Sequence, residues 1–311
     1  MLKEIPVVDL SDLRTDPKAI ELVGQAMHDI GFIFVRTRGI TNLLKNVYPE
    51  FRKVFDLPEA IKKRYEHEKL DHQVGWTPPK SETALACKKI LDGEDMPDAK
   101  ENWFMGPDEL TGLNLANPVI AKYPKPYHPN VWPEEVPTFE LAMRSLYSSL
   151  TVPGLAVMRA ISQFLGKDSE YLGNLVIDGP SRMRAIHYPP LKQEEIGKVA
   201  WGCKHTDINF VTSLPPSTKS SLWVRRRDGE YILAQPPEDC SLVQTGDMLH
   251  RLHKEFMSTP HEVRAPGKPT DTGRLSAALF FHPRPDVDLA GKTAHDFLNE
   301  RLGDIGLKSK Y

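Results

Sequence analysis

The chain has 311 residues, enough for one large domain with a single core, and its 40% hydrophobic and 26% charged residues are typical of an ordinary globular protein. A formal net charge of −2 provides no field that would attract polyanions, so we expect no nucleic acid and no anionic membrane surface among its partners.

The cysteines and the apolar runs bear on cellular location. Cys87, Cys203 and Cys240 are widely spaced and odd in number, which favours neither a disulfide framework nor a cysteine-based zinc site. We therefore expect free thiols, with Cys203 as a small buried one, and a reducing, cytoplasmic location. No run approaches the roughly 20 apolar residues that a membrane span requires, so we expect no membrane insertion.

The N-terminal part predicts two strands that alternate with two helices. Residues 5–10 and 31–36 are short apolar runs with β-branched side chains. Asp16 and the proline after it form an N-cap and first-turn pair for a helix that ends at Gly31. Apolar residues at helical spacing over 43–55 predict the second helix.

Residues 70–135 are rich in proline and show little periodicity, so we expect irregular structure there. Its aromatic residues indicate that the segment packs against the rest of the chain: Trp76, Trp103, Phe104 and Trp132. An apolar stripe then predicts a long helix over 137–165, with a kink at Pro153.

From Ser181 onward, short β-rich runs alternate with turn segments rich in proline, glycine and aspartate. The runs are RMRAIHY, INFVTSL, SLWVRR, EYIL, CSLVQT and RLSAALFFH. Helices lead and strands follow. This order predicts an α+β protein with an antiparallel barrel or sandwich and helices outside it.

Three residues of the β-rich half form a candidate metal site. His205 and Asp207 lie two apart, so in a strand both side chains would leave on one face. His261 follows 56 residues later on another predicted β segment. Two imidazoles and one carboxylate on one side of an octahedral Fe(II) leave positions open for a cosubstrate and O₂. A lone His-X-Asp is weak evidence, so the prediction depends on what accompanies it.

An arginine supplies the accompanying signal. Arg274 begins the most apolar of the predicted strands, where a guanidinium is costly to bury without a carboxylate partner. Ser276 lies two residues further on the same face. The pair predicts a grip for a distal carboxylate beside the metal.

With these motifs in order, the chain resembles the isopenicillin N synthase-like family of 2-oxoglutarate-dependent dioxygenases. The resemblance covers nearly the whole chain through residues 5–10, 31–35, Tyr188-Pro189-Pro190, His205-Thr206-Asp207, Thr245-Gly246-Asp247, 258–263 and Arg274-Leu275-Ser276. It implies a distorted double-stranded β-helix, or jelly roll, flanked by N-terminal and central helices. We expect a single domain over 1–311, with a mainly helical or irregular part at 1–180, the jelly-roll core at 181–285 and a C-terminal helical tail at 286–311.

The resemblance also implies residue roles. His205, Asp207 and His261 match the iron ligands of the family. Arg274, Ser276 and Tyr188 match residues that hold 2-oxoglutarate. Phe280 matches an aromatic position of the substrate pocket, and His187, His250, His253 and His282 are further pocket candidates, although a histidine near an apolar strand is more often structural. Arg182 and Arg184 could bind an acidic substrate, but we favour surface or structural pairing for them.

The activity implied is a non-haem Fe(II) dioxygenase of secondary metabolism that uses 2-oxoglutarate and O₂ to oxidise a C–H bond of a small molecule, releasing succinate and CO₂. Hydroxylation, desaturation, cyclisation and demethylation remain open, as do the substrate and the oligomeric state. The nearest alternative is an iron oxidase or oxidative cyclase that does not use 2-oxoglutarate. A zinc hydrolase with the same ligands and a non-catalytic jelly-roll binding protein are weaker alternatives.

Overall fold

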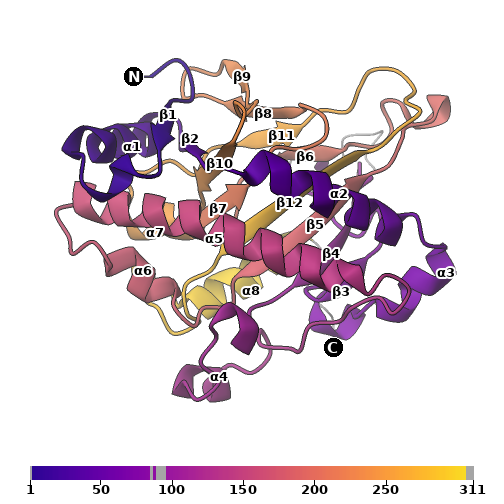
Figure 1. Ribbon diagram of the computed structural model, residues 1–311, viewed down its shortest axis with the longest axis horizontal. Helices are drawn as coiled ribbons and strands as arrows, with labels where there is room; N and C mark the ends of the chain where they lie inside the picture. The colour runs from indigo at the N-terminus through magenta and orange to yellow at the C-terminus, as the bar shows by residue number, and fades with distance from the viewer. Residues whose placement is uncertain (1, 85–86, 89–95, 306–311) are drawn as a thin grey trace.

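Two β-sheets form the centre of the protein in the computed structural model, which describes residues 2–84, 87–88 and 96–305 (Figure 1). The larger sheet has the strand order β1-β2-β10-β7-β12-β5-β4-β3, and the smaller has the order β6-β11-β8-β9. Apart from the parallel pair of β1 and β2, neighbouring strands are antiparallel. The α+β prediction is therefore confirmed.

The strands of the larger sheet are β1 (Val7–Asp9), β2 (Phe32–Arg36), β3 (Gly75–Thr77), β4 (Glu101–Met105), β5 (Arg182–Tyr188), β7 (Val211–Leu214), β10 (Cys240–Thr245) and β12 (Arg274–Phe281). Those of the smaller sheet are β6 (Gly202–His205), β8 (Leu222–Arg225), β9 (Tyr231–Leu233) and β11 (His261–Val263). The helices are α1 (Pro17–Asp29), α2 (Ile40–Phe55), α3 (Glu59–Lys62), α4 (Pro118–Lys122), α5 (Thr138–Phe164), α6 (Tyr171–Val176), α7 (Asp247–Leu252) and α8 (Ala294–Asp304).

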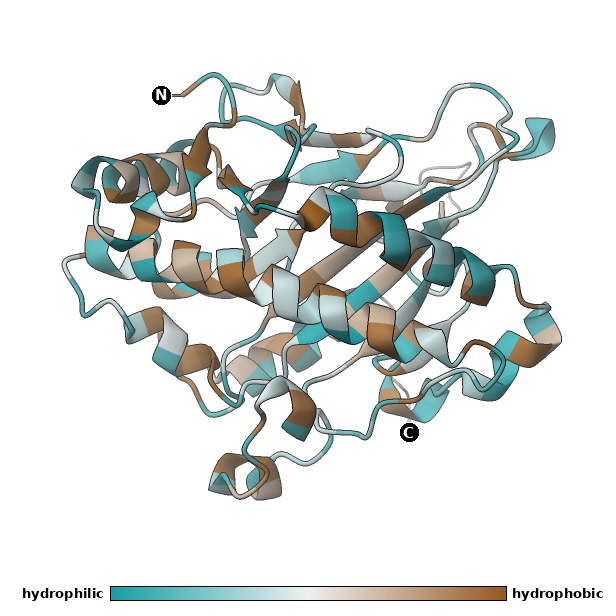
Figure 2. Cartoon of the chain, viewed as in Figure 1, coloured by the Kyte–Doolittle hydropathy of each residue, from teal (hydrophilic) through white to brown (hydrophobic). Residues whose placement is uncertain are grey.

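The long helices α1, α2 and α5 lie together on one side of the larger sheet (Figure 1). Helix α1 begins as expected, since the Asp16 side chain accepts a hydrogen bond from the Lys18 amide at 2.9 Å and Pro17 occupies the first turn. Around α2 and α5 hydrophobic and hydrophilic residues alternate, as expected for helices with one buried face (Figure 2). Helix α5 is continuous through Pro153.

Two hydrophobic cores follow from this layering. The first lies between the helices and the larger sheet, and the second lies between the two sheets. Strand β5 contributes to both cores because alternate side chains leave on opposite faces. Its Met183 and Ala185 belong to the first core, and its Ile186 and Tyr188 to the second. The face between the sheets also carries the site described below.

The segment 70–135 is more regular than we expected. It contains β3 and β4, and β4 pairs with β5 so that Trp103 lies opposite Ala185. Trp76 and Trp103 are fully buried. The prediction that the segment packs on the rest of the chain is confirmed, while the prediction of irregular structure is wrong for these strands. The run ENWFM has no alternating polarity because the strand is buried on both faces.

The prediction of free thiols is wrong for two cysteines. Cys87 and Cys203 form a disulfide, with Cα atoms 6.1 Å apart. The two residues are 116 positions apart, and they meet because the segment with Ala84 and Cys87 packs beside β6. Cys240 is the free, buried cysteine among the described residues. No helix in the described ranges is long and apolar enough to span a membrane.

Candidate active site

His205, Asp207 and His261 come together at the edge of the smaller sheet. His205 is the last residue of β6 and lies opposite His261, the first residue of β11. Their Nε2 atoms lie 3.7 Å and 3.6 Å from Asp207 Oδ1, and one ligand atom from each of the three residues lies within 4.8 Å of the others. Asp207 follows the end of β6, so the loop after the strand, rather than strand alternation, places its carboxylate beside His205.

Backbone carbonyls fix the orientation of both imidazoles. His205 Nδ1 lies 2.6 Å from the Cys203 carbonyl, and His261 Nδ1 lies 3.1 Å from that of Thr259. A carbonyl only accepts, so each Nδ1 carries the proton and donates it. In the neutral imidazole each Nε2 then presents a lone pair toward the Asp207 carboxylate, which is the tautomer that a metal ligand requires.

The Asp207 carboxylate is oriented by two buried donors. Its Oδ2 accepts hydrogen bonds from the Thr212 hydroxyl and the Gln244 amide, which leaves Oδ1 facing the histidines. Burial alone would raise the pKa of Asp207, but the charges of His261 and His205 hold it below its usual value. Burial and the charge of His261 lower the pKa of His205 to about 4. The carboxylate of Asp207 and the neutral imidazole of His205, which are the metal-binding forms, therefore predominate at neutral pH.

Asp247 joins two loops next to the metal ligands, one that follows β6 and one that precedes β11. Its carboxylate accepts from the Thr206 hydroxyl at 3.1 Å and from the Ser258 hydroxyl at 2.5 Å, one from each loop. It also forms an ion pair with Arg301 of α8 at 3.2 Å. This aspartate belongs to the Thr245-Gly246-Asp247 motif, and its position explains why the motif accompanies the metal ligands.

Arg274, Ser276 and Tyr188 lie further along the face between the two sheets. Arg274 is opposite Tyr188 across β12 and β5, and Ser276 is opposite Ile186, so all four side chains share one face. The Arg274 guanidinium lies over the Tyr188 ring at 4.7 Å. Arg274 and Ser276 are buried.

One atom of Arg274 indicates what these residues could hold. Its Nε donates to the Lys219 carbonyl at 2.9 Å, whereas its Nη1 is buried without a hydrogen-bond partner among the described residues. An unpartnered buried guanidinium nitrogen is costly, and a carboxylate is its best partner. The donor set of two Nε2 atoms and one carboxylate suits Fe(II), and the free donor of Arg274 suits the distal carboxylate of 2-oxoglutarate.

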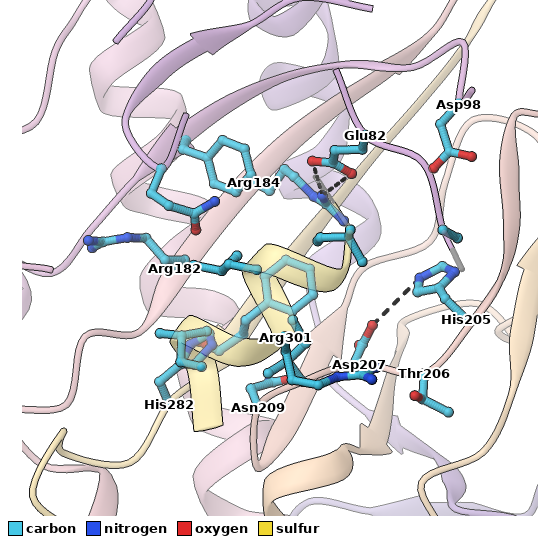
Figure 3. A pocket seen from close by; sticks show the side chains of 18 of the residues that line it. Glu82, Asp98, Arg182, Arg184, His205, Thr206, Asp207, Asn209, His282 and Arg301 are labelled. Atoms are coloured by element: carbon cyan, nitrogen blue, oxygen red, sulfur yellow. Dashed lines mark hydrogen bonds and ion pairs between the residues drawn. The ribbon is translucent and has the colours of Figure 1, made fainter. Parts of the chain in front are cut away.

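A cavity of about 320 Å³ lies beside the metal ligands His205 and Asp207 (Figure 3). His205, Asp207, Phe280 and His282 line it, together with Leu298 and other residues of α8. The volume is in the range of small-molecule sites. Phe280 is among the lining residues, and its contact with a substrate stays a prediction.

The cavity wall contains a buried network of charges. Glu82 pairs with Lys100 at 2.9 Å and with Arg184 at 3.2 Å, and Lys100 also pairs with Asp98. Burial alone would raise the pKa of Glu82, but Lys100 and Arg184 hold it at about 2. Structural pairing is therefore confirmed for Arg184. Arg182, which is buried and lines the cavity, does not have the surface position we expected.

His187 does not line this cavity. It leaves β5 on the helix-facing side, where its Nδ1 lies 2.8 Å from Glu101 Oε1 and its ring stacks on Phe55. The physical reason is strand alternation, since its neighbours Ile186 and Tyr188 face the space between the sheets. His250 and His253 contact Phe256 and Tyr171 and also lie outside the cavity lining, so His282 is the one pocket residue among these four histidines.

Several residues of the site were not identified from the sequence: Thr212, Gln244, Glu82, Lys100 and Arg301. They come from separate segments and act through contacts between them, so no local spacing marks them. For Thr212 and Gln244 the only signal was their place in predicted strands near the motifs.

Two protein-family profiles match the chain. The profile described as the N-terminal region of non-haem dioxygenases in morphine synthesis matches residues 5–135, and that of the 2-oxoglutarate-Fe(II) oxygenase superfamily matches residues 180–283. Together they cover well over half of the chain, and the second contains His205, Asp207, His261 and Arg274.

Curated proteins and solved structures agree with these profiles. A 2-oxoglutarate-dependent dioxygenase of Monascus ruber is 26% identical over 92% of this chain and 86% of its own length. A homoarginine-6-hydroxylase of Arabidopsis thaliana is 27% identical over 83% and 72%. A crystal structure of a 2-oxoglutarate-Fe(II) oxygenase family protein of Caulobacter crescentus is 28% identical, with a TM-score of 0.77 and coverage of 97% and 99%. A full-length Neurospora crassa protein crystallised in complex with alpha-KG, 24% identical over 97% and 98%, has the same fold at a TM-score of 0.79.

Proposed function

Because the chain belongs to the Fe(II)- and 2-oxoglutarate-dependent oxygenases that act on small molecules, we propose that it hydroxylates a C–H bond of an organic substrate held in the cavity beside His205 and Asp207. His205, Asp207 and His261 would hold the iron. When bound, iron and 2-oxoglutarate supply the activation of O₂ that oxidises the substrate, with release of succinate and CO₂.

The observation that carries this proposal is the unpartnered Nη1 of Arg274 on the inner face of β12. Arg274 would bind the distal carboxylate of 2-oxoglutarate, and Ser276 would donate its hydroxyl to the same group. Tyr188 packs against the guanidinium and would fix its orientation. The cosubstrate would then lie between the sheets, inside a hydrophobic core that excludes water.

The substrate would enter from the other side of the ligands. Phe280 and Phe104 form part of the cavity wall, and α8 closes it with Leu298 and Leu302. In this arrangement the chain orients two reactants from opposite sides and shields both from solvent. Positioning of this kind decides which C–H bond is oxidised, and we propose hydroxylation as the outcome.

The proposal differs from its alternatives in what Arg274 does. A zinc hydrolase with the same ligands binds no cosubstrate carboxylate, so it would not need the buried guanidinium of Arg274 on the inner face of β12. An oxidase that draws all its electrons from the substrate could use Arg274 for a substrate carboxylate, but it would form no succinate. Succinate formation therefore separates the two iron enzymes.

The test is anaerobic titration of the protein with Fe(II) and then 2-oxoglutarate, followed by the weak visible charge-transfer band of the chelated cosubstrate. We expect the band in the wild type, its loss in His205→Ala and a much higher half-saturating 2-oxoglutarate concentration in Arg274→Ala. Arg264→Ala, at an exposed arginine just after β11, is the matched control. Bound iron without a band would favour the oxidase, and absence of iron binding would contradict the proposal.

A further inference from the structure

Arg182 is a buried cation without an anionic partner. Arg182 is 6% exposed, and none of the ion pairs within the described residues includes it. One nitrogen, Nη2, donates to the Pro126 carbonyl. Burial lowers the pKa of Arg182 to about 10, and the nearby Tyr147 and Tyr127 offset this only in part. Burying an unpaired guanidinium destabilises a fold, so its presence calls for a function.

The other buried charges of the cavity are already matched. Glu82 and Asp98 are neutralised by Lys100 and Arg184. Arg301 is paired with Asp247, and Asp207 faces the metal site. These pairings leave Arg182 as the buried cavity cation whose charge is unmatched among the described residues.

Arg182 also has space beside it. It lies in the wall that the main cavity shares with a smaller one of about 50 Å³. In the smaller cavity Asp71 and Lys125 form an ion pair with each other at 2.7 Å. Figure 3 shows Arg182 and His282 on one side of the cavity and His205 on the other. Burial and the charge of Arg182 lower the pKa of His282 to about 4, so this neighbour is neutral at physiological pH.

We propose that Arg182 binds a carboxylate of the primary substrate, so that the enzyme acts on a small apolar or aromatic monocarboxylic acid whose acidic group lies at the end of the cavity away from the metal ligands. This inference rests on the proposed function for the position of the reacting carbon. A single unmatched cation, beside charges that are already paired with one another, favours a monoanion over a phosphate dianion.

The cavity lining supports the apolar part of this substrate. Phe104 and Phe280 flank the Arg184 guanidinium at 5.5 and 5.0 Å, so both rings are held in place. Ile208, Leu298 and Leu302 add aliphatic surface. An acid anchored at Arg182 would lie along these side chains with its far end near His205 and Asp207. The distance from the carboxylate to the oxidised carbon would then be fixed by the length of the cavity.

A first experiment separates this role from a structural one and needs no ligand. The variant Arg182→Met keeps most of the side-chain volume and removes the charge. If Arg182 serves a ligand, thermal unfolding of the variant without ligands will occur at the same temperature as in the wild type or higher, because an unpaired buried charge is removed. A melting temperature several degrees lower would assign Arg182 to holding the Pro126 loop and would overturn the proposal.

The second experiment measures binding of arylalkanoic acids and their primary amides, phenylacetate with phenylacetamide and 3-phenylpropionate with 3-phenylpropionamide. Binding is followed by thermal stabilisation and by perturbation of the charge-transfer band at saturating 2-oxoglutarate, which occupies Arg274. We expect the wild type and the control Arg264→Met to bind the acids at least about tenfold more tightly than the amides. Arg182→Met should lose this preference and keep the band.

The outcomes distinguish the two proposals. A normal band without any preference for acids, or a preference that Arg182→Met retains, would overturn the carboxylate site and leave the oxygenase function intact. A missing band in the wild type would overturn the proposed function, and thermal stabilisation of the metal-free protein by the acids would still decide on Arg182.

Discussion

At the scale of single residues, the hydroxyl of Thr212 has a role that its neighbour Ser213 lacks. Thr212 donates to Asp207 Oδ2, whereas the buried Ser213 hydroxyl has no hydrogen-bond partner among the described residues. Thr212→Val keeps the shape and removes the donor, so the carboxylate is less well oriented. We expect the dissociation constant for Fe(II) to rise about 10- to 100-fold. Anaerobic iron titration measures it, and Ser213→Ala should bind iron as the wild type does; equal affinity in both variants would contradict the role.

Glu82 makes a prediction about stability and pH. Its pKa of about 2 lies below the usual 4.5 because Lys100 and Arg184 favour the carboxylate. A lowered pKa stabilises the fold above about pH 4.5, and this contribution is lost as the pH falls toward 2. Glu82→Gln should therefore reduce the free energy of unfolding by about 3 kcal/mol at pH 7.

Chemical denaturation from pH 7 down to the acid limit of the native state gives the comparison. The difference between the wild type and Glu82→Gln should be constant down to about pH 4.5 and shrink below it. Glu255→Gln, at a partly exposed position, serves as the control. A difference that stays constant at low pH would show that the charge of Glu82 is not its source.

At the scale of elements, Gly154 sets how closely α5 approaches β12. A Cβ at this position would overlap the ring of Phe281. Alanine favours a helix over glycine by about 1 kcal/mol, but overpacking a rigid core costs about 1–3 kcal/mol. We expect Gly154→Ala to be destabilising, since the contact is with a buried aromatic ring.

The matched control is Gly173→Ala in α6, where a Cβ would meet only Glu170 Oε2 at 3.5 Å. This variant should be stabilised or unchanged. Thermal unfolding of both proteins measures the difference, and a stabilised Gly154→Ala would show that α5 can move away from the sheet at little cost.

The elements also show what a sequence can predict. Strand period and turn residues identified β5, β10 and β12, and the spacing of His205, Asp207 and His261 identified the metal site, because both signals are local. Strand β4 was missed, since a strand buried on both faces has no alternation. Adjacent residues of a strand face opposite sides of the sheet. Because Tyr188 lies between the sheets, its neighbour His187 has to face the helices and lies outside the pocket.

Local sequence patterns did not predict the contacts between segments that are distant along the chain. The disulfide of Cys87 with Cys203 and the pairing of Glu82 with Arg184 each join positions more than a hundred residues apart. The arginines Arg182 and Arg184 look alike in sequence and lie on the same face of β5. Only the fold shows that one is paired and the other is not. The predicted tail at 286–311 contains α8, and its last residues, 306–311, lie outside the described residues.

At the scale of the whole molecule, the reactants would be held by different parts of the chain. The residues assigned to iron and 2-oxoglutarate belong to the stretch of sequence from the start of β5 to the end of β12, residues 182–281. The cavity wall, by contrast, depends on α8, which supplies Leu298, Arg301 and Leu302. The ion pair of Arg301 with Asp247 holds α8 against the segment that contains α7. Loss of α8 should therefore separate cosubstrate binding from substrate control.

A chain that ends after Lys292 tests this separation. We expect it to form the charge-transfer band with Fe(II) and 2-oxoglutarate, because its ligands and Arg274 are intact. Its succinate formation should no longer respond to substrate, because the opened cavity holds neither the substrate nor a water-free space. Far-UV circular dichroism establishes that the shortened chain is folded. A folded chain without the band would place α8 in the structure of the iron site itself, and one with normal substrate-dependent turnover would show that α8 is not the closing wall.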